Sequence, residues 1–403
     1  MKATIGMLKK LSTVPRRINR SLKNNSEINK IRPENQPEIK NSTSETPTDP
    51  EKVLINGKWI SRKTVAFDVE PVHANTNYLY QPLFLSKDWP EKIPLSERVH
   101  GIWGYGLLFA PLSRFLKTIF MDFKTFGEHK QLQAAVSIDP LERRHKIFTV
   151  PNHIANIDDP TLISLLYKYP ECYFKSDHLP WSIAGHNILF VKKFHNWFFQ
   201  QGRASPIMRG QGIHQPGFEF LLDRLKKERG FFMNIYAEGK VNMFRDDIPL
   251  KWGLAKFLQD EVTMKSQLDE NSLEKYRAPT TRIIWHEGMC DFMSPFRQDD
   301  KKFPYFPDIS KHIFKGNRHE VSVNVGRALD FSLLIETMRK RRETDSSLVK
   351  FVARSEHMYS EDEEAECEER QVVMDLVKME MDFMKKVTQK IHEDRKSANL
   401  DEK

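Results

Sequence analysis

The residues best suited to chemistry lie in one short segment, Asn152-His153-Ile-Ala-Asn-Ile-Asp158-Asp159-Pro160. An apolar run at 147–150 precedes it and predicts a strand. Asp159 as N-cap and Pro160 at the first helical position predict that a helix follows. In a tight turn between strand and helix, Asp158 can hold one nitrogen of His153 and leave the other free to accept a proton from a hydroxyl.

This histidine and aspartate resemble the base half of a serine-protease triad, with the nucleophile supplied by the substrate. A His-x4-Asp pair alone is also compatible with a capping aspartate beside a surface histidine, so other residues must decide. Arg209 and Gly210 could together receive a phosphate, through the arginine's fork of donors and the close approach that glycine allows. Read alone, they form an ordinary loop.

Glu238 and Gly239 end the apolar run 231–236, where a glutamate is costly to bury without partners. Glu238 therefore faces a cleft or pairs with a base such as Lys240 or Arg209. His286 ends a further strand at 282–285 and is a second candidate base, although Glu287 beside it suggests a simple local ion pair.

Strands at 147–150, 231–236, 282–285 and 321–325 alternate with helices at 160–168, 215–228 and 251–261. This alternation predicts an α/β fold, a mixed sheet flanked by helices with active loops at the strand ends.

Five divisions of the chain are expected from its composition. They are a basic, disordered extension at 1–50, an unassigned extension at 51–100, a membrane-associating segment at 101–126, a catalytic domain at 127–335, and a charged C-terminal segment with an amphipathic helix at 336–403. Residues 361–369 hold seven acids and are expected to face solvent; the helix after them is expected to pack on the domain or on a partner.

Charge and cysteines exclude some classes of protein. The net charge is +8, but residues 1–50 hold ten Lys and Arg against five Asp and Glu, so +5 of it lies there. With no long basic stripe in the body, we expect no nucleic-acid partner. The three cysteines, Cys172, Cys290 and Cys367, are too far apart to predict a disulfide framework or a zinc site, and we expect no metal.

Two segments leave alternatives open. The first 26 residues contain no acid, which is typical of a mitochondrial presequence or of a basic tail. The apolar run from Gly101 to Phe120 is too short and too interrupted, at Arg114 and Lys117, to span a bilayer. We expect it to lie in one leaflet, giving an interfacial attachment; a buried core helix is the alternative.

Taken together, the segments resemble the glycerolipid acyltransferase family. The resemblance rests on Asn152-His153 with Asp158-Asp159-Pro160, Trp181-Ser182 through Asn187-Ile188 to Phe190, Phe198-Phe199, Gly202 with Arg209-Gly210, Glu238-Gly239-Lys240-Val241-Asn242-Met243, Lys251-Trp252-Gly253, and Trp285-His286 with Gly288-Met289. It covers roughly residues 100–330. Within the family, the Glu-Gly-Lys-Val-Asn-Met and Lys-Trp-Gly segments are similar to those of the mitochondrial phospholipid–lysophospholipid transacylases. The chain departs from the family pattern at Ala237 and Ile283, where prolines are usual.

The resemblance implies an enzyme, an O-acyltransferase that remodels cardiolipin by moving acyl chains between phospholipids and lysophospholipids without acyl-CoA or another cofactor. It implies that His153 is the base and Asp158 its orienting partner, and that Arg209, Gly210, Glu238 and Gly239 bind substrate. It further implies a mitochondrial membrane, inner or outer, on the intermembrane-space side; whether the protein forms a homo- or hetero-oligomer is left open.

Two rival functions remain at this point. One is an acyl-CoA-dependent lysophospholipid or glycerol-phosphate acyltransferase of the endoplasmic reticulum. The other is an inactive membrane scaffold, against which the presence of both His153 and Asp158 argues.

Overall fold

The computed structural model describes most of residues 121–292, together with 318–344 and 361–401. Short pieces before them, at 52–55, 58–61 and single positions between 111 and 118, are also described. Within 121–292, the gaps are 141, 144, 156, 167–177, 191–198, 200–201, 210–211 and 229. The expected presequence, most of the segment 101–120, Cys172 and Gly210 therefore lie outside the described residues.

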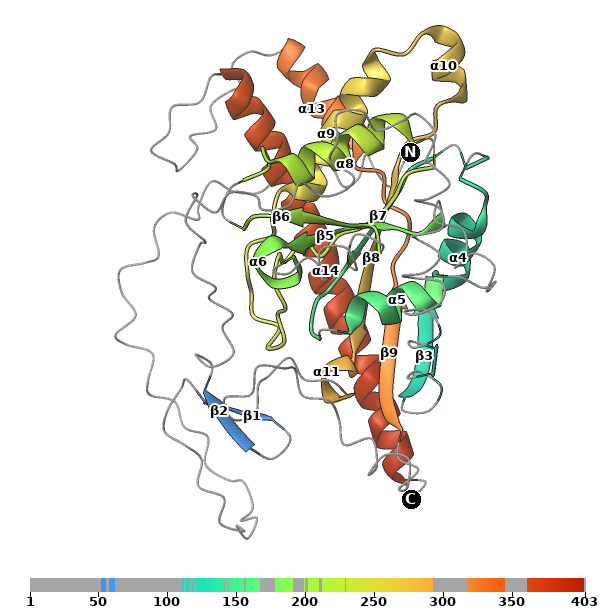
Figure 1. Cartoon of the computed structure of the whole chain (residues 1–403), viewed down its shortest axis with the longest axis vertical. Coiled ribbons are helices and arrows are strands. Elements are labelled where there is room, and N and C mark those ends of the chain that lie inside the picture. The colour runs from blue at the N-terminus through green and yellow to red at the C-terminus, as the bar shows by residue number, and fades with distance from the viewer. Residues whose placement is uncertain are drawn as a thin grey trace, which may run out of the picture. The chain divides into compact units, whose positions relative to one another are not determined.

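A seven-stranded mixed sheet forms the centre of the described fold (Figure 1), in the order β3-β9-β8-β4-β7-β5-β6. The strands are β3 (Met121–Gly127), β4 (Ile147–Pro151), β5 (Trp181–Gly185), β6 (Ala204–Ile207), β7 (Phe232–Asn234), β8 (Thr280–Glu287) and β9 (His319–Val325). Neighbours pair in parallel except β8 and β9, which are antiparallel. The five strands from β8 to β6 thus all end at one edge of the sheet. A separate two-stranded sheet joins β1 (Lys52–Ile55) and β2 (Lys58–Ser61).

Alternate residues of the central strands face two different hydrophobic cores, as the two-residue period of a strand requires. Phe148, Val150, Met233 and Trp285 pack in one core, whereas Ile147 packs in the other. Such strands are buried on both faces, which is typical of parallel sheets.

Helices cover both faces and make the layers on either side of the sheet (Figure 1). The first core also contains residues of α8 (Pro216–Lys227), α9 (Gly253–Ser266), α13 (Ser332–Thr344) and α14 (Glu361–Asp401). The second core contains residues of α4 (His129–Ser137) and α5 (Asp158–Leu166). The short helices are α6 (His186–Leu189), α10 (Glu270–Lys275) and α11 (Met289–Phe292).

The predicted α/β fold class is confirmed, and each strand and helix predicted between residues 127 and 335 is present with shifted ends. One start signal was wrong: α5 begins at Asp158, so Asp159 is inside the helix and not its N-cap. Three strands of the sheet were not predicted, namely β3, β5 and β6, and neither were the helices α4, α6, α10, α11 and α13. β3 and β6 are the two outermost strands, where one side of the strand has no neighbour and the apolar pattern is weaker.

The C-terminal helix is part of the domain and not a separate segment. Five of its apolar side chains, Val373, Met374, Val377, Met381 and Met384, lie in the first core, so the predicted packing of this helix on the domain is confirmed. The expected boundary at 335/336 falls inside α13. The acidic run was also partly misread, because Glu369 is buried and pairs with Arg339 and Arg342.

The last six residues of the expected membrane-associating segment, 101–126, belong to the sheet. They lie in β3, which pairs with β9 along seven positions. The expectation of membrane association is therefore limited to 101–120. No helix in the described parts of the chain has the length and apolar character needed to span a bilayer.

Candidate active site

The candidate base lies at the centre of the parallel part of the sheet. His153 follows β4 by two residues, and β4 has β8 on one side and β7 on the other. Parallel strands gather their following loops at one edge, which is where ligands bind in open α/β sheets. His153, Glu238 after β7 and Arg209 after β6 therefore lie along the same edge of the sheet.

The predicted pairing of His153 with Asp158 is present in the structure. His153 Nδ1 lies 3.0 Å from Asp158 Oδ2. The same oxygen accepts the backbone N–H groups of Ile154 at 2.7 Å and Ala155 at 2.8 Å. The Asp158 side chain is fully buried, whereas that of His153 is 21% exposed. The turn thus holds the carboxylate rigidly inside and presents the imidazole at the surface.

This geometry assigns the protons of the imidazole. The carboxylate accepts the N–H of His153 Nδ1, so Nε2 carries the free lone pair. Within the described part of the chain, no hydrogen bond occupies Nε2. The arrangement can therefore take a proton from a hydroxyl that reaches the exposed ring.

A second group of polar side chains, from β7 and the residues just after it, lies beside the imidazole, and sequence reasoning missed it. The ring of Tyr236 stacks on that of His153, with centroids 4.2 Å apart, and its hydroxyl lies 3.4 Å from Asp159 Oδ1. Asn234 donates to the same oxygen at 2.7 Å and accepts from Thr149 at 2.8 Å. Burial raises the pKa of Asp159. The signal was Asn234, a polar residue within an apolar strand.

Glu238 reaches the turn of the base from the adjacent strand. The N–H of His153 donates to Glu238 Oε2 at 3.4 Å, and the N–H of Asn242 donates to the His153 carbonyl at 2.5 Å. Burial raises the pKa of Glu238 to about 7, against the lowering effect of His153 and Asn242. The sequence predicted that Glu238 either faces a cleft or pairs with Lys240 or Arg209. The structure shows the first, because Glu238 lines a cleft with Asn242 and Trp285. Among the described residues, no ion pair joins it to Arg209 or Lys240.

Gly239 has a structural reason to be glycine. Its φ of +70° lies in the left-handed region, and a Cβ there would come within 2.9 Å of the Lys251 side chain. Its N–H donates to the Tyr236 carbonyl at 3.0 Å. The tight turn expected after Glu238 is therefore present.

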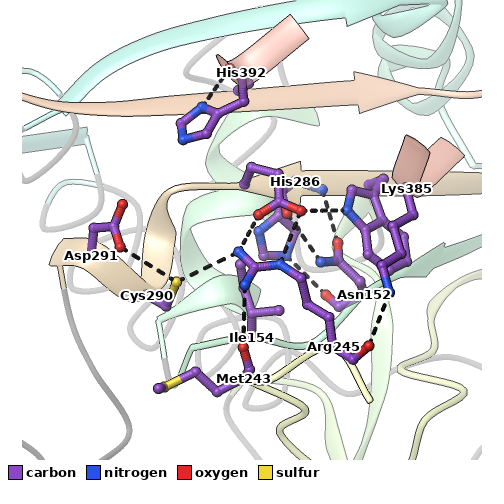
Figure 2. A network of polar contacts seen from close by, with 12 residues as sticks. Asn152, Ile154, Met243, Arg245, His286, Cys290, Asp291, Lys385 and His392 are labelled. Atoms are coloured by element: carbon purple, nitrogen blue, oxygen red, sulfur yellow. Dashed lines mark hydrogen bonds and ion pairs between the residues drawn. The ribbon is translucent and has the colours of Figure 1, made fainter. Parts of the chain in front are cut away.

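The loop that follows Gly239 is fixed to β8 and α14 (Figure 2). Arg245, at a φ of +56°, forms a two-pronged ion pair with Glu287, and the Trp285 indole donates to the same carboxylate at 3.0 Å. Lys385 of α14 donates to the Arg245 carbonyl at 2.9 Å. The strained backbone of Arg245 is thus held by both side-chain and main-chain contacts.

Arg209 lies farther from the base than Glu238 does. It follows β6, three strands from β4, which is roughly 14 Å at the usual strand spacing. Its side chain is half-buried, and burial lowers the pKa of its guanidinium. The strand that carries Arg209 is therefore well separated from the strand that carries His153.

His286 was predicted to form a local pair with Glu287, and this is wrong. Glu287 pairs with Arg245, while the fully buried ring of His286 turns toward the base. His286 Nε2 lies 2.9 Å from the Asn152 carbonyl oxygen and 3.7 Å from Asp158 Oδ2. Being inaccessible, it cannot be a second base for an external substrate.

Comparisons with known proteins show that the chain is similar to acyltransferases. Residues 133–264 match the model of the family described as Acyltransferase. The chain is 28% identical over 206 residues to "Tafazzin" of Drosophila melanogaster, covering 51% of this chain and 46% of the relative. It is 30% identical over 156 residues to "Taffazin" of Dictyostelium discoideum, covering 38% and 50%. It is also 30% identical over 203 residues to the "N-acylphosphatidylethanolamine synthase" of Arabidopsis thaliana, covering 47% and 59%.

The solved structures include one of a 1-acyl-sn-glycerophosphate acyltransferase from Thermotoga maritima, 11% identical, with a TM-score of 0.34 and coverage of 60% of this chain and 80% of that one. A TM-score this low is no evidence of a shared fold. The sequence matches confirm the predicted resemblance to tafazzin-like acyltransferases. The matched regions span about half the length of the curated relatives.

Proposed function

We propose that this tafazzin-like acyltransferase chain moves a fatty acyl group from a phospholipid to the free hydroxyl of a lysophospholipid, without acyl-CoA. The observation that carries the proposal is the 3.0 Å contact between His153 Nδ1 and Asp158 Oδ2 at the carboxyl edge of the sheet. A buried carboxylate that fixes one nitrogen of a partly exposed imidazole, and leaves the other nitrogen without a partner among the described residues, is suited to activating an alcohol.

The proposed reaction uses His153 as general base and then as general acid. His153 Nε2 takes the proton of the lysolipid hydroxyl as its oxygen attacks the acyl ester of the donor. The new ester bond forms, the bond to the donor's glycerol oxygen breaks, and the imidazolium returns the proton to that oxygen. Asp158 stabilises the imidazolium in between. The donor leaves as a lysophospholipid, so no other reactant is needed.

Binding of the substrate is assigned to the loops beside the base. Glu238, next to His153, would accept hydrogen bonds from the glycerol backbone, and Gly239 with its tight turn would let that backbone approach. Arg209 would hold a lipid phosphate through its fork of donors, with Gly210 beside it allowing close contact. A separation of roughly 14 Å between the strands that carry base and arginine suits a phospholipid, whose phosphate lies away from the reacting ester.

The location and the substrate are further parts of the proposal. We propose a mitochondrial membrane, inner or outer, on the intermembrane-space side, attachment through 101–120, and cardiolipin among the substrates. The support is the similarity to proteins named tafazzin and the apolar, interrupted character of 101–120.

A second acceptor is supported by one comparison. The relative named for N-acylphosphatidylethanolamine synthesis matches over about as much of this chain as the Drosophila relative does. A histidine base could deprotonate an amine as it does a hydroxyl, so phosphatidylethanolamine is the alternative acceptor. Acyl-CoA is the alternative donor, as in the acyl-CoA-dependent acyltransferases of the endoplasmic reticulum.

One experiment separates these functions. The purified chain is incubated with vesicles that hold a phospholipid labelled in its acyl chain, with monolysocardiolipin or with phosphatidylethanolamine as acceptor, and separately with labelled acyl-CoA. We expect label in cardiolipin without acyl-CoA, and no transfer by His153→Ala. Label appearing only from acyl-CoA, or only on the amine, would replace the proposal by the corresponding alternative. No transfer from either donor to either acceptor would indicate a scaffold.

A further inference from the structure

The peptide unit that leads into His153 is held at both ends, by a side chain of β8 and by a side chain of the loop after β7. Its carbonyl oxygen, of Asn152, lies 2.9 Å from His286 Nε2 on β8. Its N–H, of His153, donates to Glu238 Oε2 from the loop after β7 at 3.4 Å. Rotation of this peptide would swing the His153 side chain, so the two contacts fix the direction in which the base points.

His286 is also tied to Asn152 through the main chain. The Asn152 side chain accepts the His286 N–H at 2.9 Å and donates to the His286 carbonyl at 3.1 Å. Both residues are fully buried. These two hydrogen bonds use only the backbone of His286, so substituting its side chain removes the third contact and leaves the other two.

The tautomer of His286 is fixed by what surrounds it. Nε2 faces a carbonyl oxygen, which can only accept, so Nε2 must carry the proton. Burial lowers the pKa of His286 and outweighs the raising effect of Asp158. The ring is therefore neutral at physiological pH. At 3.7 Å from Nε2, the Asp158 oxygen is beyond hydrogen-bond length, so its negative charge stays available to His153.

We propose that His286 is a positioning residue for the reaction, a neutral donor that fixes the Asn152 carbonyl and through it the orientation of His153. The inference rests on the proposed role of His153 as base. This positioning role of His286 cannot be read from its place in the sequence. A histidine at a strand end is equally compatible with a base, a metal ligand or a surface ion pair.

The decisive comparison is between two substitutions of His286. In His286→Gln, the amide Nε2 stands near the position of the imidazole Nε2 and can still donate to the Asn152 carbonyl. In His286→Phe, a ring of similar size remains but the donor is lost. A displacement of a catalytic group by about 1 Å can cost on the order of 100-fold in rate. We therefore expect kcat of His286→Phe to fall by at least tenfold, with KM little changed, and kcat of His286→Gln to stay within a few-fold of the wild type.

A buried histidine away from the base provides the control. His392 of α14 is 7% exposed and its Nδ1 lies 3.1 Å from the Ser322 hydroxyl. We expect His392→Phe to lower the melting temperature about as much as His286→Phe does, with kcat unchanged. If His286→Phe lowered kcat only by destabilising the protein, His392→Phe would lower kcat to a similar extent.

Three results would overturn the inference: full kcat in His286→Phe, equal loss of kcat in His286→Gln and His286→Phe, or an equal loss in the control. The proposed function is tested separately by His153→Ala in the same assay. If His153→Ala is inactive and His286→Phe is fully active, the base assignment stands and only the positioning role fails. If His153→Ala is active, the base assignment itself fails.

Discussion

The two ends of the parallel sheet edge differ in how firmly their functional side chains are held. At the β8-β4-β7 end, His153 is held by a carboxylate, a stacked ring and contacts at both ends of its own peptide. At the β6 end, Arg209 is half-buried in the loop after the strand, and its side chain has no hydrogen bond or ion pair with another of the described residues. The proposed base is thus fixed in the chain itself, whereas the side chain proposed to bind phosphate has fewer contacts within the described residues.

This difference predicts two kinds of mutational effect. Groups that orient the base act on the transition state, so their loss should lower kcat. Groups that hold a distant part of the substrate contribute binding to both ground and transition states, so their loss should appear mainly in KM. Substitutions at the two ends should therefore separate kinetically, and a failure to separate would break the comparison.

The largest effect is expected for His153→Ala. Loss of a general base typically costs about 10²–10⁴-fold in rate. The His153 ring is partly exposed and its packing is mainly the stack on Tyr236. Transfer should therefore fall to near background, with only a modest loss of melting temperature and with vesicle binding preserved. His145→Ala is the matched control, since this half-buried histidine precedes the opposite end of β4. Near-normal turnover in His153→Ala would refute the base assignment.

Asp158→Asn should cost nearly as much as loss of the base. The amide cannot stabilise an imidazolium, and it can present a donor to His153 Nδ1, which favours the wrong tautomer. Because the carboxylate also accepts two backbone N–H groups, some loss of stability is expected too. Kinetics and thermal melting of the same preparation distinguish the two effects; a folded variant with wild-type kcat would contradict the account.

Glu238 gives a prediction that depends on pH. Its pKa is raised by burial from 4.5 to about 7, so the folded state binds this proton more tightly than the unfolded state. The resulting stabilisation is complete below about pH 4.5 and is lost as pH rises through 7. Glu238→Gln, which is always neutral, should therefore gain stability relative to the wild type between pH 5 and pH 8, by up to about 3 kcal/mol. Melting curves across this range test it, and parallel curves would contradict it.

Activity of the Glu238→Gln variant should follow the same titration. If the charged carboxylate accepts hydrogen bonds from the glycerol, the variant should lose more activity at pH 8, where Glu238 of the wild type is mainly ionised, than at pH 6. A loss independent of pH would assign Glu238 to holding the His153 N–H alone.

The smallest effect is expected at Arg209, at the β6 end of the sheet edge. Arg209→Lys keeps the charge but not the fork, so we expect KM for the phospholipid to rise several-fold while kcat and melting temperature stay near normal. Arg327→Ala is the control, since Arg327 is 63% exposed and only weakly paired with Glu380 at 4.0 Å. Full activity in Arg209→Ala would remove the phosphate role. A loss mainly in kcat would show that the two ends are not separate.

Sequence reasoning recovered the contacts that are local in the chain. His153 and Asp158 are five residues apart, and the strand and helix signals around them define the turn that joins them. Contacts between strands were not recoverable, because strand order cannot be read from one sequence. His286 is 133 residues from His153, and only the placement of β8 beside β4 turns its ring toward Asn152. Tyr236 and Asp159 meet for the same reason, through β7 on the other side.

The sequence also gave wrong predictions for charged residues whose partners are distant in the chain. Glu369 belongs to an acidic run that indicates a solvated surface, yet it is buried against Arg339 and Arg342. Likewise, Glu287 adjoins His286 but pairs with Arg245 from the loop after β7. In both cases the partner comes from a different element, and only the packing of that element decides which carboxylates leave water.

The central claim, that His153 and Asp158 act as one unit, is tested most directly by a double-mutant cycle. Acyl transfer between phospholipid and lysophospholipid is measured for the wild type, His153→Ala, Asp158→Asn and the double variant under identical conditions. Residues that act as a unit give strongly non-additive effects. We predict that the double variant is no slower than His153→Ala alone, because Asp158 acts only through the imidazole. Multiplication of the two single losses in the double variant would contradict the account.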